Sequence, residues 1–313
     1  MLDFFLTVGL YSSVLFFCAV VFTNLFDQPN HPDQSDQSDQ LKHCSDEQHS
    51  KGDAKEQHSK GDAKEQTAQE LEKWLFNLDA PMDIEDNPKI AFVTLTNNAY
   101  HHFTLNCLKS LRFLQGPQLQ TYCIGNECAK NIQLEGYPVS ILHADVSLQN
   151  RQLFRKGLWG SLTQKKFAII HKNLLVHDYV CITDGDIVFR KSVWEYLLNS
   201  VTDLDILIQN DTMDDSCTEN LCSGFMFIKK TPATLEVFDP INTINRVSEI
   251  EFDDQVYINE VKHKLNFGLL PLDLFPNGKY FYHNQYRIDP MLIHFNWCMD
   301  KIKAMQSFGY WNE

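Results

Sequence analysis

The segment VCITDGDIVF, residues 180–189, is an apolar run interrupted by two aspartates that flank one glycine. An apolar run of this length predicts a short buried strand, so Asp184 and Asp186 follow a strand directly. Gly185 permits the backbone bend that would turn both carboxylates toward one ion. Carboxylate oxygens are hard ligands that suit Mn²⁺ or Mg²⁺, and either ion would bridge a diphosphate. We therefore predict a divalent-cation site at Asp184, Gly185 and Asp186.

Strand-like and helix-like segments alternate on both sides of this motif. Apolar runs predict strands at 90–95, 119–125, 137–144, 179–183, 204–209 and 224–229. Helical spacing predicts helices at 99–114, 164–178 and near 192–200. This order favours an α/β fold with a mixed, mainly parallel sheet and helices on both faces. We expect one catalytic domain over residues 89–313.

Ligands bind at the carboxyl ends of strands in open α/β sheets, so polar residues there are site candidates. Besides the two aspartates, this rule selects residues after the strands at 90–95 and 204–209, namely Thr94, Thr96, Asn97 and Asp211.

The D-x-D tripeptide also has another interpretation. Phosphohydrolases with an aspartate nucleophile carry D-x-D after an apolar strand near the start of their domain. Here the motif lies in the middle of the domain, and Ile187 follows it in place of a small hydroxyl residue. A phosphohydrolase therefore remains the less favoured alternative.

The N-terminal part of the chain predicts attachment to a membrane. An uncharged apolar run covers 4–26, long enough to span a bilayer, so we expect a transmembrane anchor at 1–26, with a cleaved signal peptide as the alternative. Residues 27–66 contain the tandem repeat EQHSKGDAK and predict a hydrated stem. Leu71, Trp74, Leu75 and Leu78 share one helical face, which predicts a neck helix within the linker 67–88. This layout is typical of type II membrane enzymes with a lumenal catalytic domain in the Golgi or endoplasmic reticulum.

Charge and cysteine content exclude two classes. The formal net charge of −14 disfavours nucleic acid as a partner, because phosphate neutralisation needs Lys and Arg. No CxxC pair occurs among the nine cysteines, which disfavours a structural zinc site. Cys123 and Cys128, and likewise Cys217 and Cys222, are five positions apart. Each pair is either a disulfide of a lumenal domain or two buried thiols.

Five ordered segments between about 90 and 311 resemble the nucleotide-diphospho-sugar transferase family of GT-A glycosyltransferases, including plant xylosyl- and arabinosyltransferase-like enzymes. Besides the D-x-D strand, they are CSGFMFIKK (222–230), FDDQVYIN (252–259), LFPNG (274–278) and IHFNW (293–297) with Lys301 and FGYW (308–311). The resemblance implies a retaining enzyme that transfers a sugar from a nucleoside-diphosphate sugar to a glycan or glycoprotein. We expect the donor to be a UDP-sugar. A non-catalytic nucleotide- or carbohydrate-binding relative is the alternative.

The resemblance also implies roles for single residues. His294 would be the third metal ligand, beside Asp184 and Asp186. Lys166 and Lys301 would face the donor diphosphate, and Asp254 and Gln255 would lie beside the anomeric carbon. Each residue also has an ordinary structural interpretation: a satisfied histidine at a strand end, solvated lysines, and an N-cap at the start of a helix.

The chain departs from the family pattern at two places. Cys222 stands where the family has Asn or Thr, which puts a hydrogen bond to the donor sugar in doubt. The glycine after the H-x-N-W segment is absent, which puts the position of Lys301 beside the diphosphate in doubt.

Overall fold

The computed structural model describes residues 89–144, 146–246, 249 and 252–312. The predicted anchor, stem and neck at 1–88 lie outside these residues and stay predictions. Among the helices that the structure describes, none combines the length and the apolar character needed to cross a bilayer.

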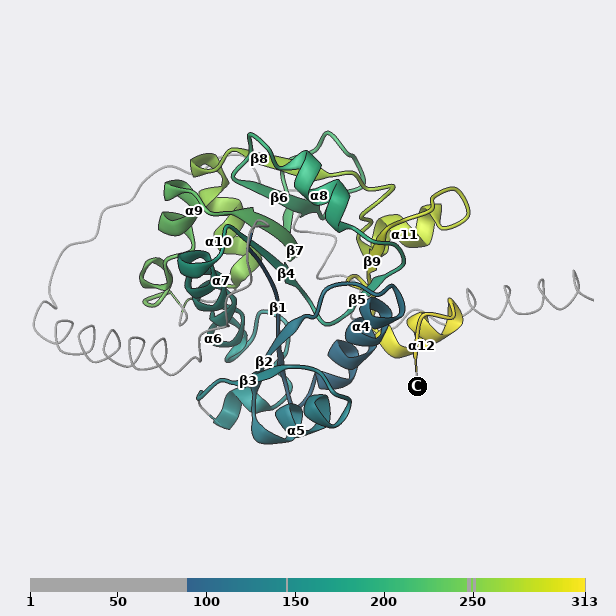
Figure 1. The fold of residues 1–313 in the computed structure, drawn as a ribbon, viewed down its shortest axis with the longest axis horizontal. Helices are drawn as coiled ribbons and strands as arrows, with labels where there is room; N and C mark the ends of the chain where they lie inside the picture. The colour runs from purple at the N-terminus through teal and green to yellow at the C-terminus, as the bar shows by residue number, and fades with distance from the viewer. Residues whose placement is uncertain (1–88, 145, 247–248, 250–251, 313) are drawn as a thin grey trace, which may run out of the picture. The chain divides into compact units, whose positions relative to one another are not determined.

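A seven-stranded mixed sheet forms the centre of the described region (Figure 1). In spatial order its strands are β3 (Val139–Ile141), β2 (Gln120–Ile124), β1 (Ile90–Asn97), β4 (Tyr179–Thr183), β7 (Leu221–Lys229), β6 (Ile206–Asn210) and β8 (Phe267–Leu270). Strand β7 runs antiparallel to both of its neighbours, whereas all the other pairings in this sheet are parallel. The carboxyl ends of β1, β4 and β6 therefore meet at one edge, beside the beginning of β7.

Helices pack on both faces of the sheet, which confirms the predicted α/β class. The chain contains α4 (His101–Phe113), α5 (Asn126–Leu134), α6 (Trp159–Thr163), α7 (Lys165–Val176), α8 (Trp194–Ser200), α9 (Pro232–Val237), α10 (Asp254–Val261), α11 (Gly278–Asn284) and α12 (Lys301–Ser307). In Figure 1, α7, α9 and α10 lie together on one side of the central strands and α4 on the other.

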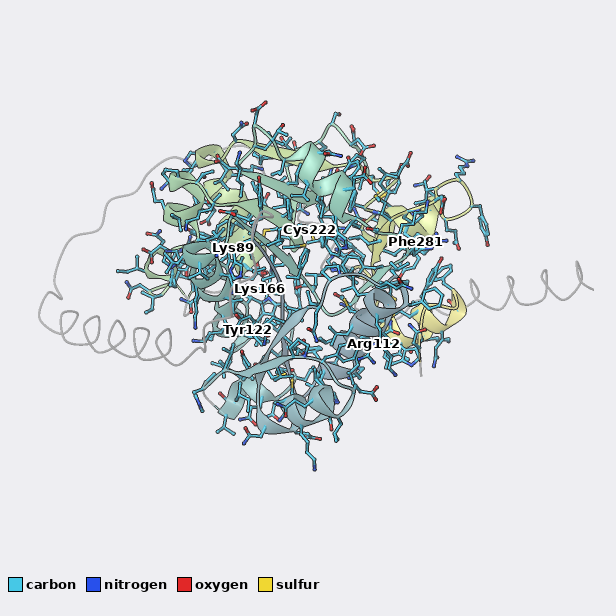
Figure 2. All side chains as sticks on the ribbon, viewed as in Figure 1. Lys89, Arg112, Tyr122, Lys166, Cys222 and Phe281 are labelled. Carbon is cyan, nitrogen blue, oxygen red and sulfur yellow. The ribbon has the colours of Figure 1, made fainter. Side chains whose placement is uncertain are left out.

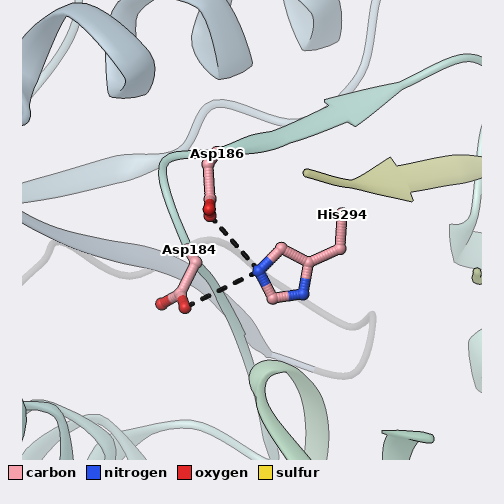
Figure 3. A group of neighbouring side chains, drawn as sticks. All are labelled: Asp184, Asp186 and His294. Carbon is pink, nitrogen blue, oxygen red and sulfur yellow. Dashed lines mark ion pairs between the residues drawn. The ribbon is translucent and has the colours of Figure 1, made fainter. Parts of the chain in front are cut away.

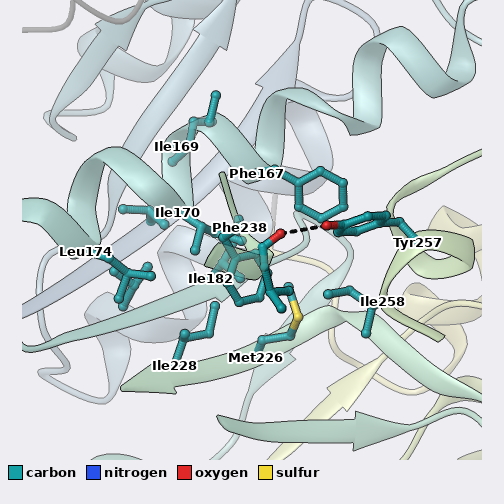
Figure 4. Packing of buried hydrophobic residues seen from close by; sticks show 14 of the residues in the cluster. Phe167, Ile169, Ile170, Leu174, Ile182, Met226, Ile228, Phe238, Tyr257 and Ile258 are labelled. Atoms are coloured by element: carbon teal, nitrogen blue, oxygen red, sulfur yellow. Dashed lines mark hydrogen bonds between the residues drawn. The ribbon is translucent and has the colours of Figure 1, made fainter. Parts of the chain in front are cut away.

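Strand residues alternate between the two hydrophobic cores. In β7, Met226 and Ile228 belong to the core beneath α7 and α10, whereas Phe225 and Phe227 belong to the core beneath α4 and α8. The same alternation explains why continuous apolar runs form these strands, because a strand covered on both faces has no polar side. Figure 4 shows the first core, where the Tyr257 hydroxyl donates a hydrogen bond to the Val237 carbonyl at 2.8 Å.

Strand β3 is shorter than the predicted segment 137–144. Pro138 immediately precedes it, and proline has no N–H for a sheet ladder. Strand β3 also lies at the sheet edge, so pairing with β2 over three residues is its only support in this sheet.

A second, two-stranded sheet continues from the D-x-D motif. Strand β5 (Ile187–Phe189) pairs antiparallel with β9 (Leu292–His294), and Ile187 lies opposite His294. This pairing brings the C-terminal part of the domain to the residues that follow β4.

Replacing Phe225 by Ala tests the core beneath α4. The Phe225 side chain is fully buried and packs against the rings of Phe189 and Phe275, with centroids 6.0 Å away in each case. We expect the free energy of unfolding to fall by about 3–5 kcal/mol in urea titrations. The matched control is Phe113→Ala, because Phe113 is 88% exposed and should change stability by less than about 0.5 kcal/mol. Equal losses for both variants would contradict the packing described.

Candidate functional site

Two aspartates and one histidine converge at the carboxyl edge of the sheet (Figure 3). His294 Nε2 lies 3.3 Å from Asp186 Oδ1 and 4.0 Å from Asp184 Oδ2. One potential ligand atom from each residue falls within 4.8 Å of the others. The structure thus brings together the three residues that the sequence and the family resemblance selected as metal ligands.

The small β5–β9 sheet positions the imidazole. His294 ends β9 opposite Ile187, one residue after Asp186, and the Phe295 N–H donates to the Asp186 carbonyl at 3.0 Å. On the other side, the Asp184 N–H donates to the Gly224 carbonyl of β7 at 2.7 Å. Backbone hydrogen bonds therefore fix the main-chain positions from which the two carboxylates and the imidazole extend.

Gln209 orients the imidazole. Its side-chain nitrogen donates to the carbonyl oxygens of Phe275 and Pro276, both at 3.0 Å, so its Oε1 is the atom left to face the ring. That Oε1 lies 2.8 Å from His294 Nδ1. Since an amide oxygen only accepts, Nδ1 carries a proton, and Nε2 is the nitrogen that faces the aspartates. A metal-binding histidine usually needs such an outer partner.

The LFPNG turn (274–278) supports Gln209. Two of its carbonyls accept from Gln209, and Asn277 donates to the carbonyls of Asn210 and Thr212 at 3.0 and 2.7 Å. The Gly278 N–H donates to Asn296 Oδ1 at 2.7 Å. The turn consequently ties the end of β6 to the segment that contains His294.

Two glycines make room in the site. A Cβ on Gly224 would lie 2.3 Å from His294 Cε1 and 3.0 Å from Asp184 Oδ2, so any larger residue would displace the cluster. Gly185 lies in a turn directly after β4, where the Ile187 N–H donates to the Asp184 carbonyl at 3.4 Å, so the backbone does bend between the two aspartates. A Cβ on Gly185 would lie 2.4 Å from Thr104 Oγ1, so the glycine also allows close approach of α4.

The cluster fits a divalent ion. Two carboxylates and one neutral imidazole are suitable ligands for Mn²⁺ or Mg²⁺. Bonds of about 2.1 Å to a common ion place ligand atoms roughly 3 to 4.2 Å apart in octahedral geometry. The distances of 3.3 and 4.0 Å measured from His294 Nε2 lie in that range.

Two lysines neutralise the carboxylates. Lys166 Nζ on α7 lies 2.6 Å from Asp184 Oδ1 and 2.7 Å from Asp254 Oδ2, and Figure 2 labels it at the centre of the view. Lys301, at the start of α12, forms an ion pair with Asp186. Lys301 therefore reaches the cluster despite the altered loop. Two ammonium groups thus face three carboxylates at the site.

These contacts shift the proton affinities of the site. Burial alone would lower the pKa of Lys166, but the Asp184 and Asp254 carboxylates raise it above its ordinary value. Burial would likewise raise the pKa of Asp186, yet Lys301 holds it well below its usual range. Burial raises the pKa of Asp184, and Lys166 offsets only part of that effect. Both lysines thus stay charged in the site.

Asp254 and Gln255 begin α10 beside the cluster. The N-cap of α10 is Asp253, whose side chain accepts from the Val256 N–H at 2.7 Å, so Asp254 does not cap this helix. Its carboxylate instead bonds Lys166. Gln255 Nε2 donates to Asp211 Oδ2 at 3.1 Å and to Asn220 Oδ1 at 2.9 Å. Asp254 therefore contacts the cluster through Lys166, whereas Gln255 bonds the neighbouring Asp211 and Asn220.

Two of the three candidates from β1 lie inside the strand. Strand β1 extends to Asn97, so Asn97 closes the strand, whereas Thr94 and Thr96 lie within it as buried residues. Neither threonine hydroxyl has a hydrogen-bond partner in the described part of the chain. Asn97 donates to the carbonyls of Leu148 and Asn150 and accepts from the N–H groups of Ala99 and Tyr100. Its amide holds a loop together.

The cysteines of the two predicted pairs are free thiols in the structure. Cys222 is buried in β7, with Sγ 3.6 Å from His294 Nδ1, and burial raises the pKa of its thiol well above the ordinary value. It is therefore a neutral thiol that packs against the ring. Cys123 and Cys128 Sγ atoms lie 2.7 Å apart as free thiols, whereas Cys217 and Cys222 are free and not in contact in the structure.

Gln209 is the residue of this site that sequence reasoning missed. It is the last side chain of the predicted strand 204–209, and it is fully buried in the structure. A polar residue that ends an apolar run was the available signal, because the same rule selected Asp211 two positions later. Its partner is 85 positions away, so the pair was not recognisable from spacing.

Replacing Gln209 by Met tests its effect on the ligand set. The variant keeps all three candidate ligands but leaves Nδ1 of His294 without its acceptor, so we expect Mn²⁺ affinity to fall by about 10- to 100-fold in calorimetric titrations. Gln120→Met is the matched control, because Gln120 begins β2 at the opposite edge of the sheet. Unchanged affinity in Gln209→Met would show that the amide does not orient the metal ligand.

Known proteins resemble this chain in sequence and in fold. A curated relative, the UDP-galactose:fucoside alpha-3-galactosyltransferase of Dictyostelium discoideum, is 24% identical over 290 residues, which is 73% of this chain and 43% of the relative. The chain therefore spans less than half of that protein's length.

Solved structures include the galactosyltransferase LgtC, at 11% identity and a TM-score of 0.49, covering 70% of this chain and 93% of LgtC. Another is the glycosyltransferase GlyE of Streptococcus pneumoniae, at 14% identity and a TM-score of 0.49, covering 72% of this chain and 61% of GlyE. The family model for nucleotide-diphospho-sugar transferases matches residues 120–308, which include the D-x-D motif and all the segments after it as far as Lys301. The chain belongs to the nucleotide-diphospho-sugar transferase family.

Proposed function

We propose that this protein is a metal-dependent glycosyltransferase that moves a sugar from a UDP-linked donor onto a glycan or glycoprotein, with retention of anomeric configuration. One observation carries the proposal: Asp184, Asp186 and His294 converge at the strand edge, and Lys166 and Lys301 reach the same carboxylates. Two anionic ligands and two cationic side chains in one small site suit an ion together with a diphosphate.

The residues divide the work of holding the donor. Asp184, Asp186 and His294 would hold Mn²⁺ or Mg²⁺, which when bound supplies Lewis-acid stabilisation of the charge on the leaving diphosphate. Lys166 and Lys301 place fixed ammonium groups beside the same carboxylates, where they stabilise negative charge that develops during bond breaking. Neither lysine needs to gain a proton for this role, because neighbouring carboxylates raise the pKa of each, against the effect of burial.

The proposal of retention comes from the chemistry of α10. Gln255 is a neutral amide, and the carboxylate of Asp254 is occupied by the buried ammonium of Lys166, so neither is a free nucleophile. In the step that we propose, the bond from the anomeric carbon to the diphosphate oxygen breaks. The acceptor hydroxyl oxygen then bonds the same face of that carbon, and the hydroxyl proton passes to the leaving diphosphate.

The curated relative suggests the first substrates to try. Its name describes transfer from UDP-galactose to a fucoside. We propose UDP-galactose as the first donor and fucosides among the first acceptors for this chain. We also propose the Golgi or endoplasmic reticulum lumen as its location, on the basis of the predicted anchor at 1–26.

The Asp184→Asn variant tests the proposed activity. The purified full-length protein should bind UDP more tightly with Mn²⁺ than with EDTA, and should release UDP from a donor in a panel that begins with UDP-galactose. In Asp184→Asn, we expect the rate of UDP release to fall by at least about 100-fold, since the variant removes a charged ligand of the site. Asp289→Asn is the control, because that side chain is 71% exposed on the surface.

Three results would favour other functions. A folded protein that binds no UDP with or without metal would sink the proposal. Metal-independent nucleotide binding that survives Asp184→Asn would indicate a non-catalytic binding protein. Release of inorganic phosphate from phosphate esters would indicate a phosphohydrolase.

A further inference from the structure

Asp211 accepts hydrogen bonds from several side chains next to the candidate metal cluster. Its Oδ1 accepts from Asn296 Nδ2 at 2.9 Å and from Trp297 Nε1 at 2.8 Å, and its Oδ2 accepts from Gln255 Nε2 at 3.1 Å. The carboxylate therefore joins the end of β6, the beginning of α10 and the segment after β9. This network includes none of the candidate metal ligands, but Gln255 follows Asp254 and Asn296 lies two positions after His294 in the sequence.

Trp297 is unusual in its backbone and in its exposure. Its φ is +56°, a left-handed conformation that side chains other than glycine adopt at a cost in energy. Its side chain is 51% exposed, whereas the other tryptophans in the described part of the chain, Trp159, Trp194 and Trp311, are more deeply covered. A strained backbone that keeps a large aromatic ring in water contributes little to the core, so folding alone does not explain it.

The ring is held in place although it is exposed. The indole N–H is fixed on Asp211, and the Lys279 ammonium lies 5.8 Å from the ring centroid. A tryptophan that is anchored at its polar edge presents its ring as a rigid apolar surface with little rotamer entropy left to lose. The same carboxylate fixes Gln255, so this surface adjoins the residues that we place beside the anomeric carbon.

We propose that the indole of Trp297 is the platform on which the sugar ring of the acceptor stacks, with Asp211 as its positioning residue. This inference rests on the proposed function and names the acceptor class: a pyranoside that presents a face of C–H bonds to the electron-rich ring. Because a single stacked aromatic frequently dominates a small interface, its removal affects acceptor binding more than donor binding.

Trp297→Gly separates this role from a structural one, because glycine adopts the left-handed backbone without strain. Saturation-transfer difference NMR would titrate methyl α-L-fucopyranoside, methyl β-D-galactopyranoside and methyl β-D-glucopyranoside into full-length protein saturated with UDP and Mg²⁺. We expect at least one glycoside to bind, and Trp297→Gly to weaken it by at least about tenfold. UDP affinity should change by less than about twofold, and the melting temperature should not fall. Tyr286→Ala, an exposed aromatic outside the network, is the control and should behave as the unaltered protein.

The possible failures can be told apart. Glycoside binding that is equal in the unaltered protein and Trp297→Gly, or absent from a protein that binds UDP, would overturn the stacking inference alone. A joint fall in melting temperature and UDP affinity in Trp297→Gly would show a structural role and overturn it too. Failure of the unaltered protein to bind UDP at all would instead contradict the proposed function.

Discussion

The hydrogen bond between Gln209 and His294 is the constraint on which the site depends. Because the Gln209 amide nitrogen is committed to the carbonyls of Phe275 and Pro276, only its oxygen can meet the imidazole. The ring is therefore protonated at Nδ1 and directs Nε2 at two carboxylates. The LFPNG turn, the β5–β9 pairing and the space left by Gly224 all act on this one geometry. Segments separated by more than 80 positions converge on a single ring nitrogen.

Charge balance is the second organising factor. Carboxylates that are withdrawn from water need cations close by, because an unpaired buried charge is strongly destabilising. Lys166 spans Asp184 and Asp254, and so it links the candidate metal ligands to the start of α10, while Lys301 meets Asp186 from α12. The lysines that pair with these carboxylates are the same groups that we propose to face the diphosphate. Asp211 extends the polar network outward to Trp297, and donor and acceptor functions would therefore share one continuous set of contacts.

Local patterns predicted the sheet, most helices and the aspartate pair, because apolar runs and helical spacing follow from which side chains face the hydrophobic core. They could not select His294 among twelve histidines, and only the family resemblance did so. Gln209 was missed because its role exists only once Phe275 and His294 are beside it. Thr96 was placed past a strand that continues through it, and the space that Gly185 leaves for α4 became visible only in the structure. The sequence alone could not show which of the adjacent residues Asp253 and Asp254 caps α10, because the choice depends on the extended backbone at Asp253.

Pulsed electron paramagnetic resonance of Mn²⁺ bound to the full-length protein tests the central claim most directly. The account predicts modulation from one directly bound imidazole nitrogen, which disappears when His294 is replaced by Gln and survives when the partly buried His171 is replaced by Gln. Nitrogen modulation that is absent from the unaltered protein, or that persists without His294, would contradict the arrangement of Asp184, Asp186 and His294 as a metal centre.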